Sequence, residues 1–220
     1  MNRRRLLGLK KQYYIILFLL ALVLFMIGTW IVKIVSGGVP FVDQWTRDLV
    51  EKLDDTYIYT GFRWVTNLGS EPFMVPFTVI AALILWWMFR SWLPALIFAG
   101  GTLGSHLLNK LIKALVDRER PSILVSANAE GHSFPSGHAM ISMVCYGLLA
   151  YFIAKKLTST KSKLLVQFLL ALLIFLIGIS RYVINVHYLT DVVAGFIIGF
   201  LCLVGLIYLY EWLHKRRTQS

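Results

Sequence analysis

Two histidines and two serines lie close together in the stretch GHSFPSGHAM, which runs from Gly131 to Met140 and precedes a long apolar segment. A serine beside a histidine is the arrangement that makes a hydroxyl nucleophilic. Ser136 followed by Gly137 is also typical of a helix N-cap, and backbone N–H groups at such a terminus bind anions. The stretch therefore predicts either a serine nucleophile or a capped anion site with His138 in the first helical turn.

A second polar cluster, KALVDRERP, ends the preceding apolar run. If the helix continues through it, Lys113 and Arg120 lie two turns apart, about 10 Å along one face, and Pro121 favours a helix end just before it. An ammonium and a guanidinium on one face suit a phosphate group. The alternative is that both cations reach outward from a membrane boundary, with Asp117 paired to Lys113. Taken alone, the cluster favours this alternative.

The third cluster is SRYVINVHYLTD, from Ser180 to Asp191. A helix that begins near Asn185 would place His187 and Asp191 four residues apart on one face. A carboxylate that accepts one imidazole N–H fixes the tautomer and leaves the second nitrogen free to act as a base or a nucleophile. A structural His–Asp pair explains the same spacing.

In chain order the clusters read K-x6-RP, PSGH and SR-x5-H-x3-D. This order resembles the three-part signature of the type 2 phosphatidic acid phosphatase superfamily, across the second half of the chain. The resemblance implies that His187 is a nucleophile that becomes a phosphohistidine, that Asp191 orients it, and that His138 protonates the leaving alcohol. It also implies a set of phosphate-binding residues, namely Lys113, Arg120, Ser136, Gly137 and Arg181.

The chemistry implied by the resemblance needs no metal and no other cofactor. The expected outer ends of the apolar runs also carry no group of carboxylates that would hold a pair of Mg²⁺ ions. Two residues of the same loop, Glu130 and His132, fall outside the signature. Contact with the substrate and simple solvation of the loop both explain them.

Most of the chain is apolar: 58% of the residues are hydrophobic and 15% are charged, against roughly 25% charged residues in soluble domains. Most apolar runs approach the ~20 residues that cross a bilayer as a helix. A signal peptide is not expected, because the first run is too long and no small-residue cleavage site follows it. The sequence predicts an all-α bundle of six transmembrane helices, at about 13–32, 72–89, 93–115, 139–154, 164–180 and 192–213.

The 22 Lys and Arg residues outnumber the 11 Asp and Glu residues, and more than half of them flank the spans on one side, in segments 1–12, 90–92, 155–163 and 214–220. Because basic flanks stay in the cytoplasm, we expect a multi-pass plasma-membrane protein with both termini inside. The three polar clusters then face the extracytoplasmic side. A nucleic-acid partner is not expected, since these charges are short flanks without a binding module.

Between the first two spans, PFVDQWTRDLVEKL places Phe41, Trp45, Leu49 and Leu53 at steps of four residues, with charged residues elsewhere around the helical wheel. This pattern predicts a short amphipathic helical region on the outer side. Its apolar face would either lie in the outer leaflet or pack against the bundle. No repeat or linker interrupts the chain, so we expect one domain, 1–220.

A phosphate site at the membrane surface favours a phosphate carried by a lipid, whose chains remain in the bilayer. Among bacterial members of the superfamily, the chain is similar to compact six-span phosphatidylglycerophosphatases. This implies conversion of phosphatidylglycerophosphate to phosphatidylglycerol, with phosphatidic acid as a further substrate. The alternatives are an undecaprenyl diphosphate phosphatase and, in a different class, an anion transporter or channel. A transporter would give the histidines no role, and its charged binding residues would be expected near the middle of the bilayer.

Overall fold

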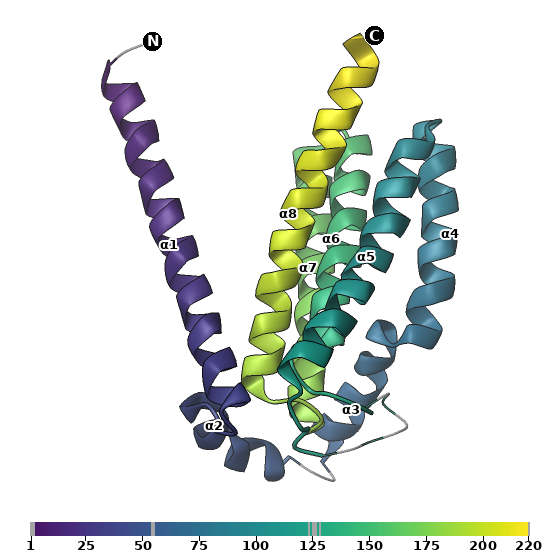
Figure 1. The fold of residues 1–220 in the computed structure, drawn as a ribbon. Helices are drawn as coiled ribbons and strands as arrows, with labels where there is room; N and C mark the ends of the chain where they lie inside the picture. Colours follow the sequence, from purple (N-terminus) through teal and green to yellow (C-terminus); the bar gives the residue numbers. More distant parts are fainter. Residues whose placement is uncertain (1–2, 54–55, 123, 125–126, 128, 220) are drawn as a thin grey trace. The chain divides into compact units, whose positions relative to one another are not determined.

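The computed structural model describes residues 3–53, 56–122, 124, 127 and 129–219, and within these the side chains from Tyr14 to Arg217 except residue 16. This part of the chain is helical and contains no strand (Figure 1), which confirms the all-α prediction. It forms two compact units, one ending at Pro40 and one beginning at Phe41. The elements are α1 (Arg3–Val35), α2 (Phe41–Glu51), α3 (Tyr57–Thr66), the 3-10 turn η1 (Asn67–Gly69), α4 (Glu71–Phe89), α5 (Trp92–Val116), α6 (Gly137–Lys156), α7 (Thr160–Val183) and α8 (Leu189–Gln219).

Each of the six predicted spans falls within one helix, α1 and then α4 to α8. By length and composition, α1, α4, α6, α7 and α8 are able to cross a membrane. α5 has the length, but His106, Asn109, Lys110 and Lys113 lower its mean hydropathy. The number of six spans, the single domain and the membrane side of the termini stay predictions. Residues 1–2 and 220, at those termini, lie outside the described residues.

The end of α5 differs from the prediction. The helix stops at Val116, because Asp117 takes a left-handed backbone conformation with a φ of 48° and donates its N–H back to Lys113 O at 3.0 Å. Aspartate tolerates this conformation better than most residues. Lys113 and Arg120 are therefore not on one continuous helix, and Arg120 belongs to the loop that follows.

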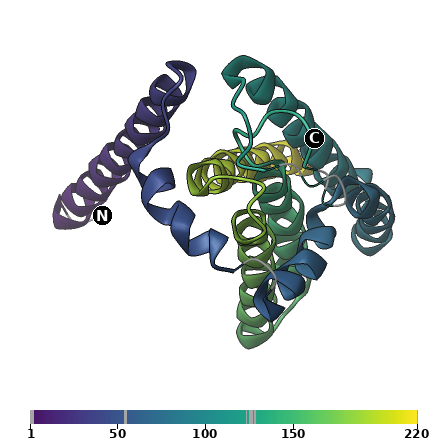
Figure 2. The ribbon, with the colours of Figure 1, turned by 90° about the horizontal axis from the view of Figure 1, so that it is seen from below.

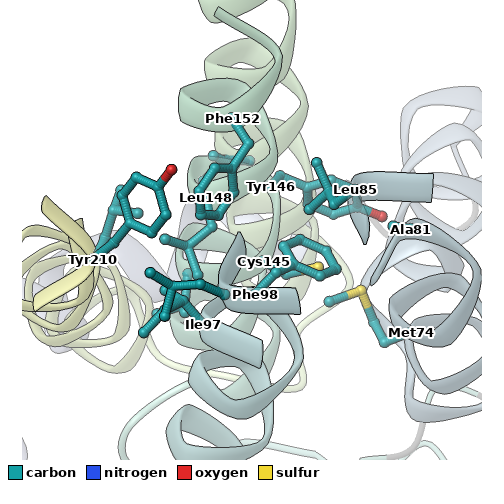
Figure 3. Packing of buried hydrophobic residues seen from close by; sticks show 14 of the residues in the cluster. Met74, Ala81, Leu85, Ile97, Phe98, Cys145, Tyr146, Leu148, Phe152 and Tyr210 are labelled. Atoms are coloured by element: carbon teal, nitrogen blue, oxygen red, sulfur yellow. The ribbon is translucent and has the colours of Figure 1, made fainter. Parts of the chain in front are cut away.

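α6 is the central helix of the second unit. Its membrane-length window is 56% buried, against 17% for the windows of α4 and α7. Figure 3 shows the core around it, where Phe98 of α5, Leu148 and Phe152 of α6, and Tyr210 of α8 meet. The rings of Phe152 and Tyr210 pack edge to face with centroids 5.0 Å apart. Because α6 begins at Gly137, this core fixes the helix terminus that carries the PSGH cluster.

The amphipathic segment forms α2, which stops at Glu51, so that the fourth apolar residue of the pattern falls in the following turn. The stripe of Phe41, Trp45 and Leu49 is exposed, at 78%, 70% and 57%. The helix instead buries its opposite face, where Asp43 is only 2% exposed. The alternative prediction that the apolar stripe packs against the bundle is therefore wrong. Contact of the stripe with an outer leaflet stays a prediction.

α8 runs so close to α6 that only glycine fits at their crossing. A Cβ atom on Gly199 would lie 2.6 Å from the backbone oxygen of Met140, and backbone cannot move aside as a flexible side chain does. We predict that Gly199→Ala lowers the free energy of unfolding by about 1–3 kcal/mol. The measurement is the midpoint of thermal unfolding in detergent micelles.

The matched control is Gly205→Ala on the same helix, where an added Cβ meets no atom within 4 Å. This variant should be unchanged or slightly more stable, because alanine favours a helix by about 0.5–1 kcal/mol over glycine. Equal midpoints for the two variants would contradict the close approach of α6 and α8.

Candidate active site

The three polar clusters meet at one end of the second unit. Viewed from that end, the loop from α5 to α6 and the turn from α7 to α8 lie side by side (Figure 2). Arg120 Nη1 donates to Val186 O at 2.9 Å, and Ser136 N–H donates to Asp191 O at 2.9 Å. These bonds connect the first and second clusters to the third, so residues distant in sequence form one site.

His187 and Asp191 form the predicted pair across a turn. α8 begins after His187 and not near Asn185, which has a φ of 56°, so the pair does not arise from helical spacing. His187 Nδ1 nevertheless lies 3.3 Å from Asp191 Oδ2. The same oxygen accepts the Tyr188 N–H at 2.9 Å and the Ser133 hydroxyl. Both members of the pair are buried, at 2% and 0% exposed.

The second ring nitrogen of His187 faces a cation. Its Nε2 lies 2.9 Å from Arg120 Nη1, and because a guanidinium only donates hydrogen bonds, this nitrogen is the acceptor. The ring proton then sits on Nδ1, toward Asp191. Burial lowers the pKa of His187 well below its usual value, and the positive charges of Arg120 and Lys113 lower it further. The result is a neutral imidazole with a directed lone pair.

Lys113 and Arg120 converge because the loop after α5 folds back. Arg120 donates from Nε to Gly131 O at 2.9 Å and from Nη2 to His132 O at 3.3 Å. Lys113 Nζ donates to the same His132 oxygen. Asp117 does not pair with Lys113, since its Oδ1 lies 2.6 Å from His132 Nδ1. The two cations thus come together at one carbonyl oxygen through the loop, and not on one helix face as predicted. The Asp117–Lys113 ion pair of the membrane-boundary alternative is not present among the described residues.

The loop residues Glu130 and His132 hold these cations through their main chain. Arg120 Nη2 donates to Glu130 O at 3.1 Å as well as to His132 O. The carbonyl oxygens neutralise part of the cations' charge without forming fixed ion pairs. Both residues also line the cavity described below. Contact of their side chains with a substrate stays a prediction.

The PSGH cluster forms a capped helix start. Ser136 Oγ accepts the Ala139 N–H at 3.5 Å, and the serine is fully buried. Its hydroxyl has no bond to a histidine within the described part of the chain, which gives no support to a serine nucleophile. Gly137 leaves little room for a side chain, since a Cβ there would meet Asn109 Oδ1 at 3.0 Å. His138 is 8% exposed, and its Nε2 has no hydrogen-bond partner among the described residues.

Arg181 is fully buried and half satisfied. Its Nη1 donates to Thr66 Oγ1 at 3.0 Å and to Ala127 O at 2.7 Å. Its Nε and Nη2 have no partner in the region that the structure describes. Buried donors in native proteins are nearly always paired, so these two nitrogens are candidates to donate to a ligand oxygen. Arg181 itself is not among the residues that line the cavity described below.

Arg118 is a buried cation that the sequence did not single out. Its Nη1 lies 2.5 Å from Asp191 Oδ1, and its Nη2 lies 2.7 Å from Asp43 Oδ2. The guanidinium stacks on the Tyr188 ring, 3.8 Å from the centroid. Thr190 closes the network, because its N–H donates to Asp43 Oδ1 at 3.0 Å. A carboxylate of α2 is thus linked to Asp191 through a single arginine.

A cavity of about 600 Å³ opens from the site and continues between α4 and α5. Its polar end is lined by Lys113, Arg120, Gly137, His138 and His187. Its apolar part is lined by Met74, Val75, Val79, Ala99 and Leu103. Within the described chain, no three His, Cys, Asp or Glu side chains group as ligands for a metal ion. The shape suits a molecule with a charged head and an apolar chain.

Comparison with known proteins gives a consistent family. Residues 94–215 match the PAP2 superfamily. Phosphatidylglycerophosphatase B of Bacillus subtilis (strain 168) is 36% identical over 141 residues, covering 62% of this chain and 68% of that protein. Dolichyldiphosphatase of Saccharomyces cerevisiae is 29% identical over 165 residues, covering 71% and 68%.

The fold agrees with the sequence match. The crystal structure of a transmembrane PAP2-type phosphatidylglycerolphosphate phosphatase from Bacillus subtilis superposes with a TM-score of 0.70 at 26% identity, covering 87% of this chain and 95% of that one. The matched residues 94–215 contain all three polar clusters and make up more than half of the chain. This protein therefore belongs to the PAP2 superfamily of phosphatases, as the order of its polar clusters implied.

Proposed function

We propose that this protein is a metal-independent lipid phosphatase that converts phosphatidylglycerophosphate to phosphatidylglycerol through a phosphohistidine on His187. The orientation of this imidazole carries the proposal. Its Nδ1 faces Asp191, and its Nε2 lone pair faces Arg120 at the wall of the cavity. When a phosphate displaces the Arg120 N–H from this nitrogen, the lone pair is free to attack phosphorus, and the carboxylate stabilises the positive charge that develops on the ring.

Two steps complete the reaction. In the first, Nε2 of His187 bonds to phosphorus while the bond from phosphorus to the glycerol oxygen breaks, and protonated His138 gives its proton to that oxygen. In the second, water attacks phosphorus, His138 takes back a proton, and the P–N bond breaks to release inorganic phosphate. His138 suits this role because it lines the same cavity and its Nε2 has no partner among the described residues.

The phosphate is held by donors from all three clusters. Lys113 and Arg120 supply charge at the cavity wall, and the unpaired Nε and Nη2 of Arg181 supply two buried donors. Ser136 fixes the helix terminus whose N–H groups, with Gly137 close by, approach the phosphate oxygens. Phosphoryl transfer depends chiefly on such charge stabilisation and in-line positioning.

The cavity and the relatives support a lipid substrate. The apolar stretch between α4 and α5 suits a lipid chain, and the similarity to phosphatidylglycerophosphatase B supports phosphatidylglycerophosphate, with phosphatidic acid as a further substrate. The similarity to a dolichyldiphosphatase supports undecaprenyl diphosphate as the second candidate. From the charge distribution, we place the site at the extracytoplasmic face and both termini inside.

Arg118 acts, in this proposal, as a positioning residue. Asp191 must stay ionised to orient His187, yet it is 0% exposed. An isolated buried carboxylate is strongly disfavoured. Arg118, itself balanced by Asp43, supplies the counter-charge without touching the imidazole.

His187→Asn should abolish phosphate release from phosphatidylglycerophosphate, because no other described side chain offers a lone pair in the same position. Acid-quenched wild-type enzyme should carry an acid-labile phosphate, located on His187 by mass spectrometry, and the variant should carry none. Ser136→Ala serves as the comparison. It removes a cap worth about 1 kcal/mol and should retain measurable turnover. A dead Ser136→Ala with an active His187→Asn would refute the assignment.

The lowered pKa of His187 predicts that its imidazole stays neutral at acidic pH. A nucleophile with a lowered pKa loses activity only when the pH falls below that pKa. The acid side of the pH–activity profile therefore shifts to lower pH. With ¹⁵N-histidine labelling and His187→Asn to assign the signal, the His187 resonance should remain that of neutral imidazole down to below about pH 6.5, the usual histidine pKa. A titration midpoint above that value would contradict the geometry.

Asp43→Asn should lower kcat by about 10- to 100-fold with little change in KM, because substrate contacts persist while Arg118 no longer holds Asp191, the partner of His187, in a fixed position. The control is Asp48→Asn, an exposed residue of the same helix, which should be silent. Asp43→Asn also leaves Arg118 underpaired, a change that costs up to about 3–5 kcal/mol for a buried pair. Thermal unfolding of each variant separates misfolding from mispositioning. A change confined to KM would contradict the positioning role of the Arg118–Asp43 pair.

A further inference from the structure

One face of α5 changes from apolar to polar along the cavity. The residues of α5 that line the cavity recur at steps of three and four, which places them in one stripe. Ala99 and Leu103 form the apolar part of this stripe, and His106, Lys110 and Lys113 form the polar part. From His106 to Lys113 the polar part extends about 10 Å along the helix axis. A single phosphate group occupies only a fraction of that length.

Two of these polar residues have no role in the site described above. Lys113 donates to His132 O, whereas Lys110 and His106 have no hydrogen bond and no ion pair with any described residue. Two carboxylates, Glu71 and Glu130, line the same cavity, but neither forms an ion pair with Lys110. Lys110 is exposed and His106 is partly buried, so both side chains are open to a ligand in the cavity. Ionisable residues within a membrane span often mark a ligand path, and α5 is one of the predicted spans.

Outward extension of the lysine to the membrane surface explains Lys110 alone, because lysine side chains reach toward water. It does not explain His106, which lies one turn further from the site and has a shorter side chain. Both residues face the cavity and not only the helix exterior. The pair therefore suits a second anionic group of the ligand that fills the cavity.

We infer that Lys110 and His106 form a binding subsite for a second phosphate, located between the phosphate that is hydrolysed and the lipid chain. The inference rests on the proposed function, since it takes the terminal phosphate to lie at His187. The ligand then runs from His187, past Lys110 and His106, to the apolar wall near Leu103. Lysine binds phosphate as a point charge, and a histidine donates one hydrogen bond to it.

This subsite selects a class of substrates. Phosphatidylglycerophosphate and undecaprenyl diphosphate both carry a second phosphate on the lipid side of the terminal one. Phosphatidic acid carries only one phosphate, so its diacylglycerol would lie against Lys110 without using the charge. The subsite therefore favours the two-phosphate lipids over phosphatidic acid.

The test compares Lys110→Gln and His106→Gln with wild-type protein on three lipids at equal mole fraction in detergent: phosphatidylglycerophosphate, undecaprenyl diphosphate and phosphatidic acid. Loss of a charged hydrogen bond predicts a fall in kcat/KM of about 10- to 100-fold for Lys110→Gln on a two-phosphate lipid. The kcat/KM for phosphatidic acid should change less than about twofold, because this lipid has no second phosphate to bind Lys110. The control is Lys161→Gln, which removes an exposed lysine of α7 and should change none of the three.

A loss confined to one two-phosphate lipid supports the subsite and identifies that lipid as its ligand. Equal losses on all three lipids, or no loss on any, overturn it. The inactive His187→Asn protein gives a second readout, the rise in thermal midpoint on adding each lipid, which Lys110→Gln should reduce for two-phosphate lipids alone. Wild-type protein that releases no phosphate would overturn the proposed function, and the binding measurement would still decide the subsite.

Discussion

The structure of the site depends on the buried guanidinium of Arg118. It lies between Asp43 and Asp191, two carboxylates that are 2% and 0% exposed. Either carboxylate alone would be too costly to bury in its charged form, and one cation shared between two anions leaves a small net charge. This ion network links α2, the loop after α5 and the start of α8. The network thereby fixes α2, this loop and the start of α8 relative to one another around His187.

The two arginines of the loop, Arg118 and Arg120, have different electrostatic tasks. Arg118 faces carboxylates and stabilises the negative charge of Asp191. Arg120 faces carbonyl oxygens and the Nε2 of His187, so its own charge is left available at the cavity wall. Arg118 offsets part of the cost of burying a charge on Asp191. Burial lowers the pKa of His187, and the positive charge of Arg120 lowers it further. A neutral imidazole beside an ionised carboxylate is the combination that a nitrogen nucleophile requires.

The polar clusters, through the family resemblance they carry, indicated the candidate residues of the site, but the sequence did not predict the contacts between its segments. His187 and Asp191 are close in sequence, so their pairing survived even though the helix begins later than predicted. Arg118 and Asp43 are separated by most of the first half of the chain, and no periodicity connects them. The hydrophobic runs identified the long helices, because a helix that is buried or that crosses a membrane needs apolar residues along several consecutive turns. The end of α5 was not predicted, because it depends on the left-handed backbone conformation of one residue, Asp117, and no hydrophobic pattern marks it.

The low hydropathy of α5 follows from the same chemistry. A helix that binds phosphate groups along one face must carry cations and hydrogen-bond donors there, and these residues reduce its average hydrophobicity. His106, Lys110 and Lys113 all line the cavity, so these three polar residues lie on the face that the proposed ligand would cover. The opposite side of the same helix packs Ile97 and Phe98 into the core with little exposure. The helix that composition alone does not identify as a span is therefore the one that carries the proposed phosphate-binding residues.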